Sequence, residues 1–325
     1  LLKRRDWGLA GLIVFPFAIA AWLYIVITPA VMYACHSFPK LSPRNSYPAQ
    51  SDQVAGVAYC DALLYCYEEG MADNWMVNDR LAPTIFLDNP QNFQLGMLEG
   101  MRQALRVLRE SLSRQRSTDA IDEDADTAFS SFNFDPNSWL LPRTEAEYRK
   151  GMSALRNYRE RLIAGKAGFY PRADNLSRFL LDMNSVAGGA NNRLLNCIPD
   201  QRMRLSEETA GDPATSGEQK VDVRVPWSTV DDHFYYARGV AFVYRETLAA
   251  VNHDFREILE QRNADEFSTA IVNDFISGTQ FNPVYVANGR FESLWANHPY
   301  KLLGLLSQVR ERTRSLRSMV TLNDD

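Results

Sequence analysis

An uncharged run from Trp7 to Cys35 constrains this chain more than any other stretch of its sequence. The run holds 29 residues without Asp, Glu, Lys, Arg or His. A helix needs about 20 apolar residues to cross the hydrocarbon core of a bilayer, so this run is long enough to span one. Pro16 predicts a kink in the helix, and aromatic residues toward both ends suit the membrane interfaces. The run therefore predicts a transmembrane helix.

Other interpretations of the run fit less well. The apolar part of a cleaved signal peptide is about 7–15 residues long, and the cleavage-like Ala18–Ala20 falls in mid-run. Met32–Cys35 resembles a lipoprotein cleavage box, but Met and Tyr are poor residues for it. A buried core helix is rarely free of charge over this length. We therefore expect an uncleaved, single-pass anchor.

The charges that flank the run set its expected orientation. Lys3–Arg5 precede it, while Lys40 and Arg44 follow it. A short basic N-terminal tail normally stays in the cytoplasm, which places the remainder of the chain outside the bacterial inner membrane. We expect residues 36–325 in the periplasm.

The net charge limits which partners the chain can bind, and the spacing of its cysteines limits which disulfides it can form. The formal net charge is −5, whereas nucleic-acid binding needs a positive surface, so no nucleic-acid partner is expected. The cysteines Cys35, Cys60, Cys66 and Cys197 lack a Cys-x-x-Cys spacing. Cys60 and Cys66 are separated by roughly 9 Å of helical rise, which is too far for a disulfide. Cys197 could pair with either, or all could remain thiols.

Polar segments divide the chain into expected parts. These are the anchor (1–35), a proline-rich tether (36–52), a first helical half (53–205), a flexible insertion (206–225) and a second helical half (226–325). Apolar residues recur at helical spacing in both halves. We expect helices near 53–70, 90–116, 144–167, 174–187, 226–258, 263–277 and 299–320. The predicted fold class is all-α: a transmembrane helix followed by long, antiparallel packed helices.

Local signals refine these expected helices. Thr144 and Glu147 form a capping box, Ser117–Thr127 is a solvated acidic bend, and Gly188-Gly189 breaks a helix. A brief hairpin is expected around Asn288-Gly289.

The longest expected helix has apolar or small residues at alternating steps of four and three. They are Val230, Phe234, Ala237, Ala241, Tyr244, Leu248, Val251, Phe255 and Ile258. This spacing indicates a seam like that of a coiled coil. The small Ala237 and Ala241 would let a partner helix approach closely.

The same region carries a resemblance to a known family. Pro226–Phe255 reads PWSTVDDHFYYARGVAFVYRETLAAVNHDF, and Trp75–Leu98, Glu145–Leu162 and Arg172–Leu176 fit the same pattern. The chain resembles the bacterial family catalogued as domain of unknown function 2333. The resemblance implies a single-pass envelope protein of Gram-negative bacteria, and it implies no activity, ligand or catalytic residue.

Motifs for catalysis or metal binding are missing. There is no Gly-x-Ser-x-Gly or His-Glu-x-x-His sequence. Asp231, Asp232 and His233 cluster, but His253 lies roughly 30 Å along the same helix and cannot join them. The aspartates fit the first turn of a helix, where acids favour the macrodipole. We predict no catalytic residue, metal or cofactor.

Two arginines give the best candidate for a binding site. Arg238 and Arg245 lie seven apart on the apolar helix, and buried arginines need carboxylate partners. An internal salt-bridge network is the favoured interpretation, and a pocket for an anionic or sugar ligand is the alternative. The predicted ligand-binding residues are Asn78, Asp79, Asp88, Asn89, Asp174, Arg238 and Arg245.

Together these features favour a non-enzymatic, membrane-anchored periplasmic protein that scaffolds or regulates an envelope complex. Its expected partners are the lipid bilayer, through Trp7–Cys35, and other envelope proteins or a second copy of the chain. The alternative is a binding module or enzyme that acts on envelope glycans or lipids through the Asp/Asn/Arg pocket.

Overall fold

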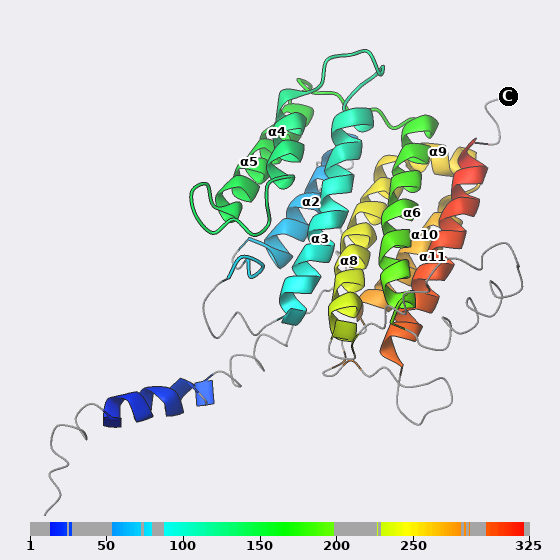
Figure 1. Cartoon of the computed structure of the whole chain (residues 1–325). Helices are drawn as coiled ribbons and strands as arrows, with labels where there is room; N and C mark the ends of the chain where they lie inside the picture. Colours follow the sequence, from blue (N-terminus) through cyan, green and yellow to red (C-terminus); the bar gives the residue numbers. More distant parts are fainter. Residues whose placement is uncertain are drawn as a thin grey trace, which may run out of the picture.

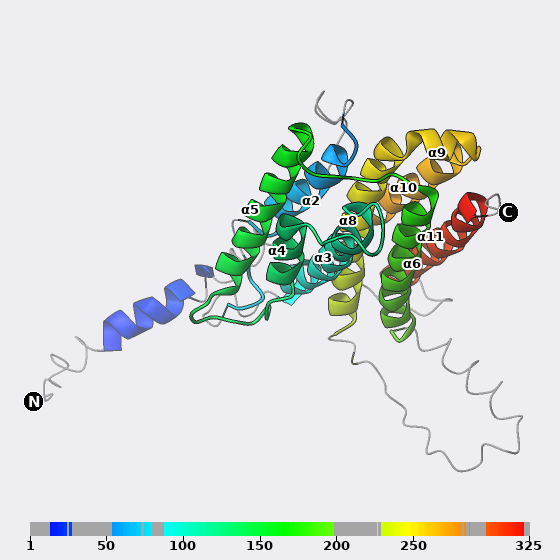
Figure 2. The same cartoon turned by 90° about the horizontal axis from the view of Figure 1, so that it is seen from above.

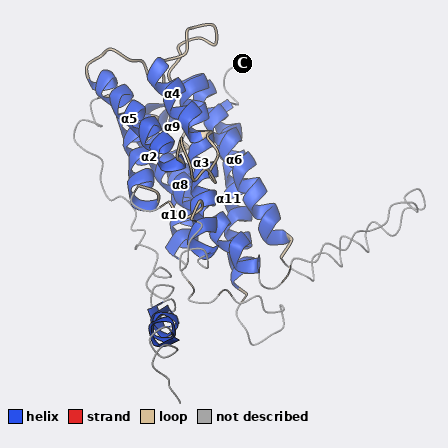
Figure 3. Cartoon of the chain, turned by 60° about the vertical axis from the view of Figure 1, so that its left-hand side comes forward, coloured by secondary structure: helices blue, strands red, loops and turns tan. Residues whose placement is uncertain are grey.

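The computed structural model describes residues 14–24, 26–27, 54–72, 75–79, 88–197, 226, 229–280, 283, 286 and 297–321. Over these ranges the chain forms helices and connecting loops and no strand (Figure 3). The all-α prediction is confirmed. The predicted tether, the flexible insertion and the hairpin at Asn288-Gly289 lie outside the described residues, as does most of the predicted anchor.

Residues 14–24 are helical, and their apolar side chains are exposed. Within the described ranges no helix combines the length and the apolar character needed to cross a bilayer. The elements that follow are α2 (Val57–Gly70), α3 (Asp88–Val107) with a π-helical end (Leu108–Leu112), α4 (Glu123–Phe132), α5 (Thr144–Ile163), α6 (Ala173–Leu195), α8 (Val230–Asp254), α9 (Arg256–Gln261), α10 (Asp265–Gln280) and α11 (His298–Thr321).

Helix α8 lies at the centre of the bundle. It packs against α2, α3, α6 and α10, with α4 and α5 on one side of the molecule and α6 and α11 on the other (Figures 1 and 2). Of its 25 residues, 17 are buried, including every residue from Ala237 to Leu248. A helix buried all round is a core helix, so the single seam predicted from the sequence is too narrow a description. The helix ends at Asp254, before the predicted Ile258, because Phe255 leaves helical geometry.

Two glycines set how closely α8 approaches α3. A Cβ atom on Gly239 would lie 2.1 Å from the carbonyl oxygen of Phe93, and one on Gly96 would lie 2.0 Å from that of Tyr236. Each helix therefore places a glycine against the backbone of the other. These two glycines make the close contact that the sequence analysis assigned to Ala237 and Ala241.

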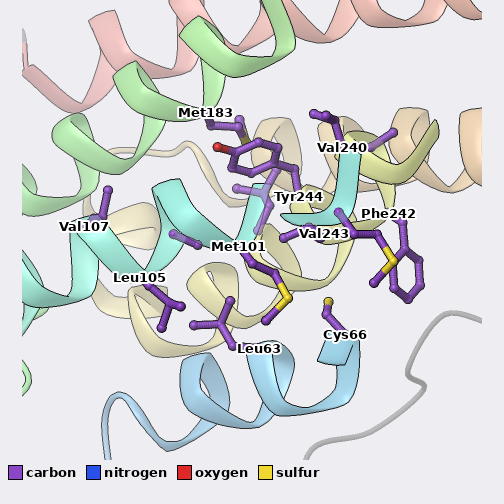
Figure 4. Packing of buried hydrophobic residues seen from close by; sticks show 14 of the residues in the cluster. Leu63, Cys66, Met101, Leu105, Val107, Met183, Val240, Phe242, Val243 and Tyr244 are labelled. Atoms are coloured by element: carbon purple, nitrogen blue, oxygen red, sulfur yellow. The ribbon is translucent and has the colours of Figure 1, made fainter. Parts of the chain in front are cut away.

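One hydrophobic core joins both predicted halves of the chain. Figure 4 shows side chains from four helices that meet there, among them Leu63, Cys66, Met101, Leu105, Met183, Val243 and Tyr244. Cys60, Cys66 and Cys197 are buried thiols, and none is in a disulfide. The structure therefore contains no disulfide between Cys197 and Cys60 or Cys66, which was one of the two alternatives left open by the sequence.

Three local predictions are wrong. The acidic stretch predicted as a bend contains the start of α4, because the Asp122 carboxylate accepts hydrogen bonds from the amides of Asp124 and Ala125. Gly188-Gly189 lies inside α6, where Gly188 packs against the Arg310 guanidinium of α11. Thr144 is the first residue of α5 and not its cap. Its hydroxyl donates to carbonyls of the preceding loop, which removes it from the predicted capping box.

Candidate functional site

The two arginines that the sequence singled out are buried on α8. Arg238 is 2% exposed and Arg245 is 1% exposed. The Nε atom of Arg245 donates to Glu246 Oε1 at 2.6 Å, and its Nη1 donates to the Thr279 hydroxyl at 2.9 Å. The Nε atom of Arg238 donates to the Thr279 carbonyl oxygen at 3.1 Å. Thr279, on α10, therefore binds both arginines.

This cluster is internal to the protein core. The arginines also lie against aromatic rings, Arg238 at 5.7 Å from Phe93 and Arg245 at 4.8 Å from Phe242. Burial, together with the charge of Arg245, lowers the pKa of Arg238 to about 10, so this side chain stays protonated at neutral pH. The carboxylate beside Arg245 is that of its sequence neighbour, Glu246.

The other predicted site residues lie in three further places. Asp88 begins α3, near the start of α8, and the adjacent Asn89 is buried. The side chain of Asn92 in the same turn donates to Asp232 Oδ1 at 2.7 Å. Burial and the charges of Asp88 and Asp231 raise the pKa of Asp232 to about 6. Asp88 therefore lies in an acidic patch at the start of α8 and not beside the two arginines.

Asn78 and Asp79 belong to the segment that follows α2. The Asn78 side chain is buried and its Nδ2 donates to the Ser138 carbonyl at 3.0 Å and to Glu145 Oε2 at 3.2 Å. The backbone amide of Asp79 donates to the Met76 carbonyl. These contacts join the segment to the loop between α4 and α5.

Asp174 lies at the far end of the bundle from Arg238. It is exposed in the first turn of α6 and forms a two-point ion pair with Arg172. The opposite end of α6 reaches the start of α8, where the Arg193 guanidinium lies 4.0 Å from the Tyr236 ring. About 28 Å of helix separates the two ends. The structure therefore places the seven predicted ligand-binding residues in separate parts of the bundle.

His253 and Asp254 lie at the C-terminal end of α8, where Asp254 links this helix to α2. Asp254 Oδ2 accepts a hydrogen bond from the Tyr59 amide at 3.1 Å, in the first turn of α2, where Gly56 supplies no side-chain cap. Burial raises the pKa of Asp254, and its neighbour His253 lies 3.5 Å away. A cavity of about 480 Å³ adjoins this pair, lined also by Val54, Pro171 and Glu257. The carboxylate acts as a long-range cap for α2.

A second groove lies between α6 and α11, away from the predicted site residues. It encloses about 290 Å³ and is lined by Leu180, Leu181 and Asn184 of α6 and by residues of α11 that include Thr313, Arg314 and Arg317. Arg317 donates to the Ser177 hydroxyl at 3.0 Å. Neither cavity contains a residue of the predicted set.

Sequence reasoning missed three features. Glu246 had a signal, because it places a carboxylate directly beside Arg245 in the mostly apolar stretch Val240–Val251. Thr279 had none, since a single threonine near a helix end is ordinary. The loop Trp139–Leu141 had a clear signal, three large apolar residues in a row between polar ones. Across the described ranges no group of three or more His, Cys, Asp or Glu side chains could hold a metal ion.

Comparison with known proteins places the chain in a family. The family model described as "Uncharacterized protein conserved in bacteria (DUF2333)" matches residues 7–322. The chain belongs to this family. The match extends over the predicted anchor as well as the bundle, so the resemblance noted in the sequence is confirmed. No curated protein and no solved structure matches the chain.

Proposed function

We propose that this member of the family is a membrane-anchored helical scaffold of the bacterial cell envelope. One observation carries the proposal. The run Trp7–Cys35 is uncharged, and where it is described, over residues 14–24, it is helical with exposed apolar side chains such as Phe17 (73%) and Trp22 (63%). Apolar side chains that face no protein core are stable in lipid. The anchor therefore supports a single-pass protein of the inner membrane.

The bundle supports a scaffold more than a catalyst. Its most unusual charged groups, Arg238, Arg245 and Asp254, hold α8, α10 and α2 together. The predicted pocket that would act on glycans or lipids has its residues spread over separate places. We therefore favour assembly with other envelope proteins, or with a second copy of the chain, as the role of the bundle.

The test is a topology and association experiment on the full chain in a Gram-negative bacterium. A C-terminal alkaline phosphatase fusion should be active, because that enzyme folds only in the periplasm, and a matched green fluorescent protein fusion should be dark. The protein should stay in the membrane fraction after alkaline carbonate washing. A bright fluorescent fusion, or release by carbonate, would overturn the anchor and its orientation. Mild crosslinking should return defined envelope proteins or a homo-oligomer, and a clean monomer would overturn the scaffold role.

A further inference from the structure

The loop between α4 and α5 exposes three consecutive large apolar side chains. Trp139 is 48% exposed, Leu140 is 72% exposed and Leu141 is 94% exposed. In the described helices and loops beyond residue 53, the other large apolar side chains with high exposure are single: Ile121, Ile163, Leu181 and Tyr300, at 38–39%. Isolated exposed apolar residues are normal on a protein surface, whereas a contiguous set marks an interaction site.

The loop is held in place by hydrogen bonds from buried and flanking side chains. The Ser138 carbonyl accepts bonds from Asn78 Nδ2 at 3.0 Å and from the Thr144 hydroxyl at 3.0 Å. The Trp75 indole donates to the Pro136 carbonyl at 2.9 Å. The apolar side chains therefore project from a fixed base, and their exposure does not come from a loose chain.

The Ser138 side chain also holds the loop together from within. The Ser138 hydroxyl lies 2.8 Å from the Pro142 carbonyl and 3.3 Å from that of Leu140, so it can donate to one of them, and Pro142 has no amide hydrogen. One carbonyl near the tip thus has a donor within the loop.

The chemistry of the tip favours a bilayer surface over a protein groove. Tryptophan prefers the headgroup level of a membrane and leucine the region below it, which matches the rise in exposure from Trp139 to Leu141. The adjacent Arg143, 58% exposed at its side chain, can reach the headgroups along an aliphatic stem.

The reach of the chain permits such contact. The loop lies at the C-terminal end of α2, since Trp75 and Asn78 hold it, while the predicted tether joins the other end. Helix α2 is about 21 Å long, and the 17 residues of 36–52 can extend to at most about 60 Å. The anchor and the loop can therefore meet the same membrane surface.

We infer that Trp139, Leu140 and Leu141 insert into the interface of the bilayer that holds the anchor, and so fix the orientation of the bundle against that membrane. This inference rests on the proposed membrane anchor. It adds a second point of attachment, which a tether alone does not supply. The partner is the lipid surface, and Asn78 supports the loop that meets it.

The test uses the full chain, reconstituted in phosphatidylcholine–phosphatidylglycerol vesicles. Cys35→Ser provides the background, because the other three cysteines are buried. A single cysteine is then introduced by Leu141→Cys, or by Leu181→Cys on α6 as the matched control, and labelled with an environment-sensitive fluorophore. Lipids that carry a quencher near the headgroup should quench the label at 141 several-fold more than the label at 181, with a blue-shifted emission at 141.

Two readouts separate the inference from the proposed function. Flotation of the vesicles reports the anchor, and a chain that fails to float would overturn both. A chain that floats, while the label at 141 remains as water-exposed as the label at 181, would overturn the inference and leave the anchor intact. An Asn78→Ala variant should reduce the quenching at 141 and leave flotation unchanged. Equal quenching with and without Asn78 would contradict its supporting role.

Discussion

Helix α8 and the loop between α4 and α5 depart from the usual distribution of side chains in opposite directions. Helix α8 buries charged groups in the core, and the loop exposes apolar groups at the surface. On α8 the buried charge of Arg245 is compensated by hydrogen bonds to Glu246 and Thr279. In the loop the Ser138 hydroxyl donates to the Pro142 carbonyl, while the side chains of Trp139–Leu141 face outward. Buried charge here is a feature of folding, and exposed apolar surface points to a partner.

Removal of the carboxylate beside Arg245 should give the largest effect. Glu246→Ala removes the carboxylate that pairs with the buried Arg245 guanidinium, and breaking a buried ion pair typically costs about 3–5 kcal/mol. We expect the free energy of unfolding of the full chain in mild detergent to fall by that amount, measured by urea denaturation. The matched control is Glu311→Ala, which breaks an exposed pair with Arg314 at 3.4 Å and should cost less than about 1 kcal/mol.

A double variant decides whether the charges themselves are needed. In Arg245→Met with Glu246→Leu, both charges are replaced by apolar side chains, and such replacements are often neutral. Stability closer to the parent than to Glu246→Ala would show that the guanidinium left behind by the missing carboxylate causes the loss. A double variant as unstable as the single one would show instead that Arg245 is needed for its bond to Thr279.

The contact between α8 and α3 should show the next largest effect. Gly239→Ala places a methyl group 2.1 Å from the Phe93 carbonyl, so the helices must separate. Overpacking of this kind costs about 1–3 kcal/mol, and a rigid backbone neighbour favours the upper end. Gly189→Ala is the control, because a Cβ atom there meets nothing within 4 Å. The control should be neutral or stabilising by up to about 1 kcal/mol, and an equal loss in both variants would contradict the close-contact explanation.

These two regions also show what the sequence could predict. Periodicity predicted α8 and the burial of Arg238 and Arg245, because it depends on residues of one helix. The Gly96–Gly239 contact joins helices that lie far apart in the chain, so no local pattern could identify it. The start of α4 was missed because an acidic run is as typical of a bend as of a first helical turn. Asp79, Asp88 and Asp174 were grouped by residue type alone, and their separation depends on how the helices pack.

The acidic patch at the start of α8 predicts a smaller, pH-dependent effect. The ordinary pKa of an aspartate is 3.8, and that of Asp232 is raised to about 6. The folded chain therefore holds a proton there that the unfolded chain has lost, so stability falls as pH rises from about 4 to 6 and stays lower above that range. Because Asp232 is partly exposed, we expect Asp232→Asn to raise the free energy of unfolding at pH 8 by only about 1 kcal/mol.

Urea denaturation at pH 4 and pH 8 measures this effect. Asp232→Asn should match the parent at pH 4, where the carboxyl is protonated, and exceed it at pH 8. The control is Asp265→Asn in the first turn of α10, which should lower stability slightly at pH 8 through loss of a charge favourable to the macrodipole. A parent and an Asp232→Asn variant with the same pH dependence would contradict the burial of this group.

The loop should show the smallest effect on stability, and this result separates it most clearly from α8. Leu140→Ser and Leu141→Ser together remove two large apolar side chains that are 72% and 94% exposed, so the free energy of unfolding in detergent should change by less than about 0.5 kcal/mol. The contrasting variant Leu105→Ala removes one fully buried side chain and should cost about 2–5 kcal/mol. If this double variant were as unstable as Leu105→Ala, the tip of the loop would be part of the core, and its exposed residues would need no partner.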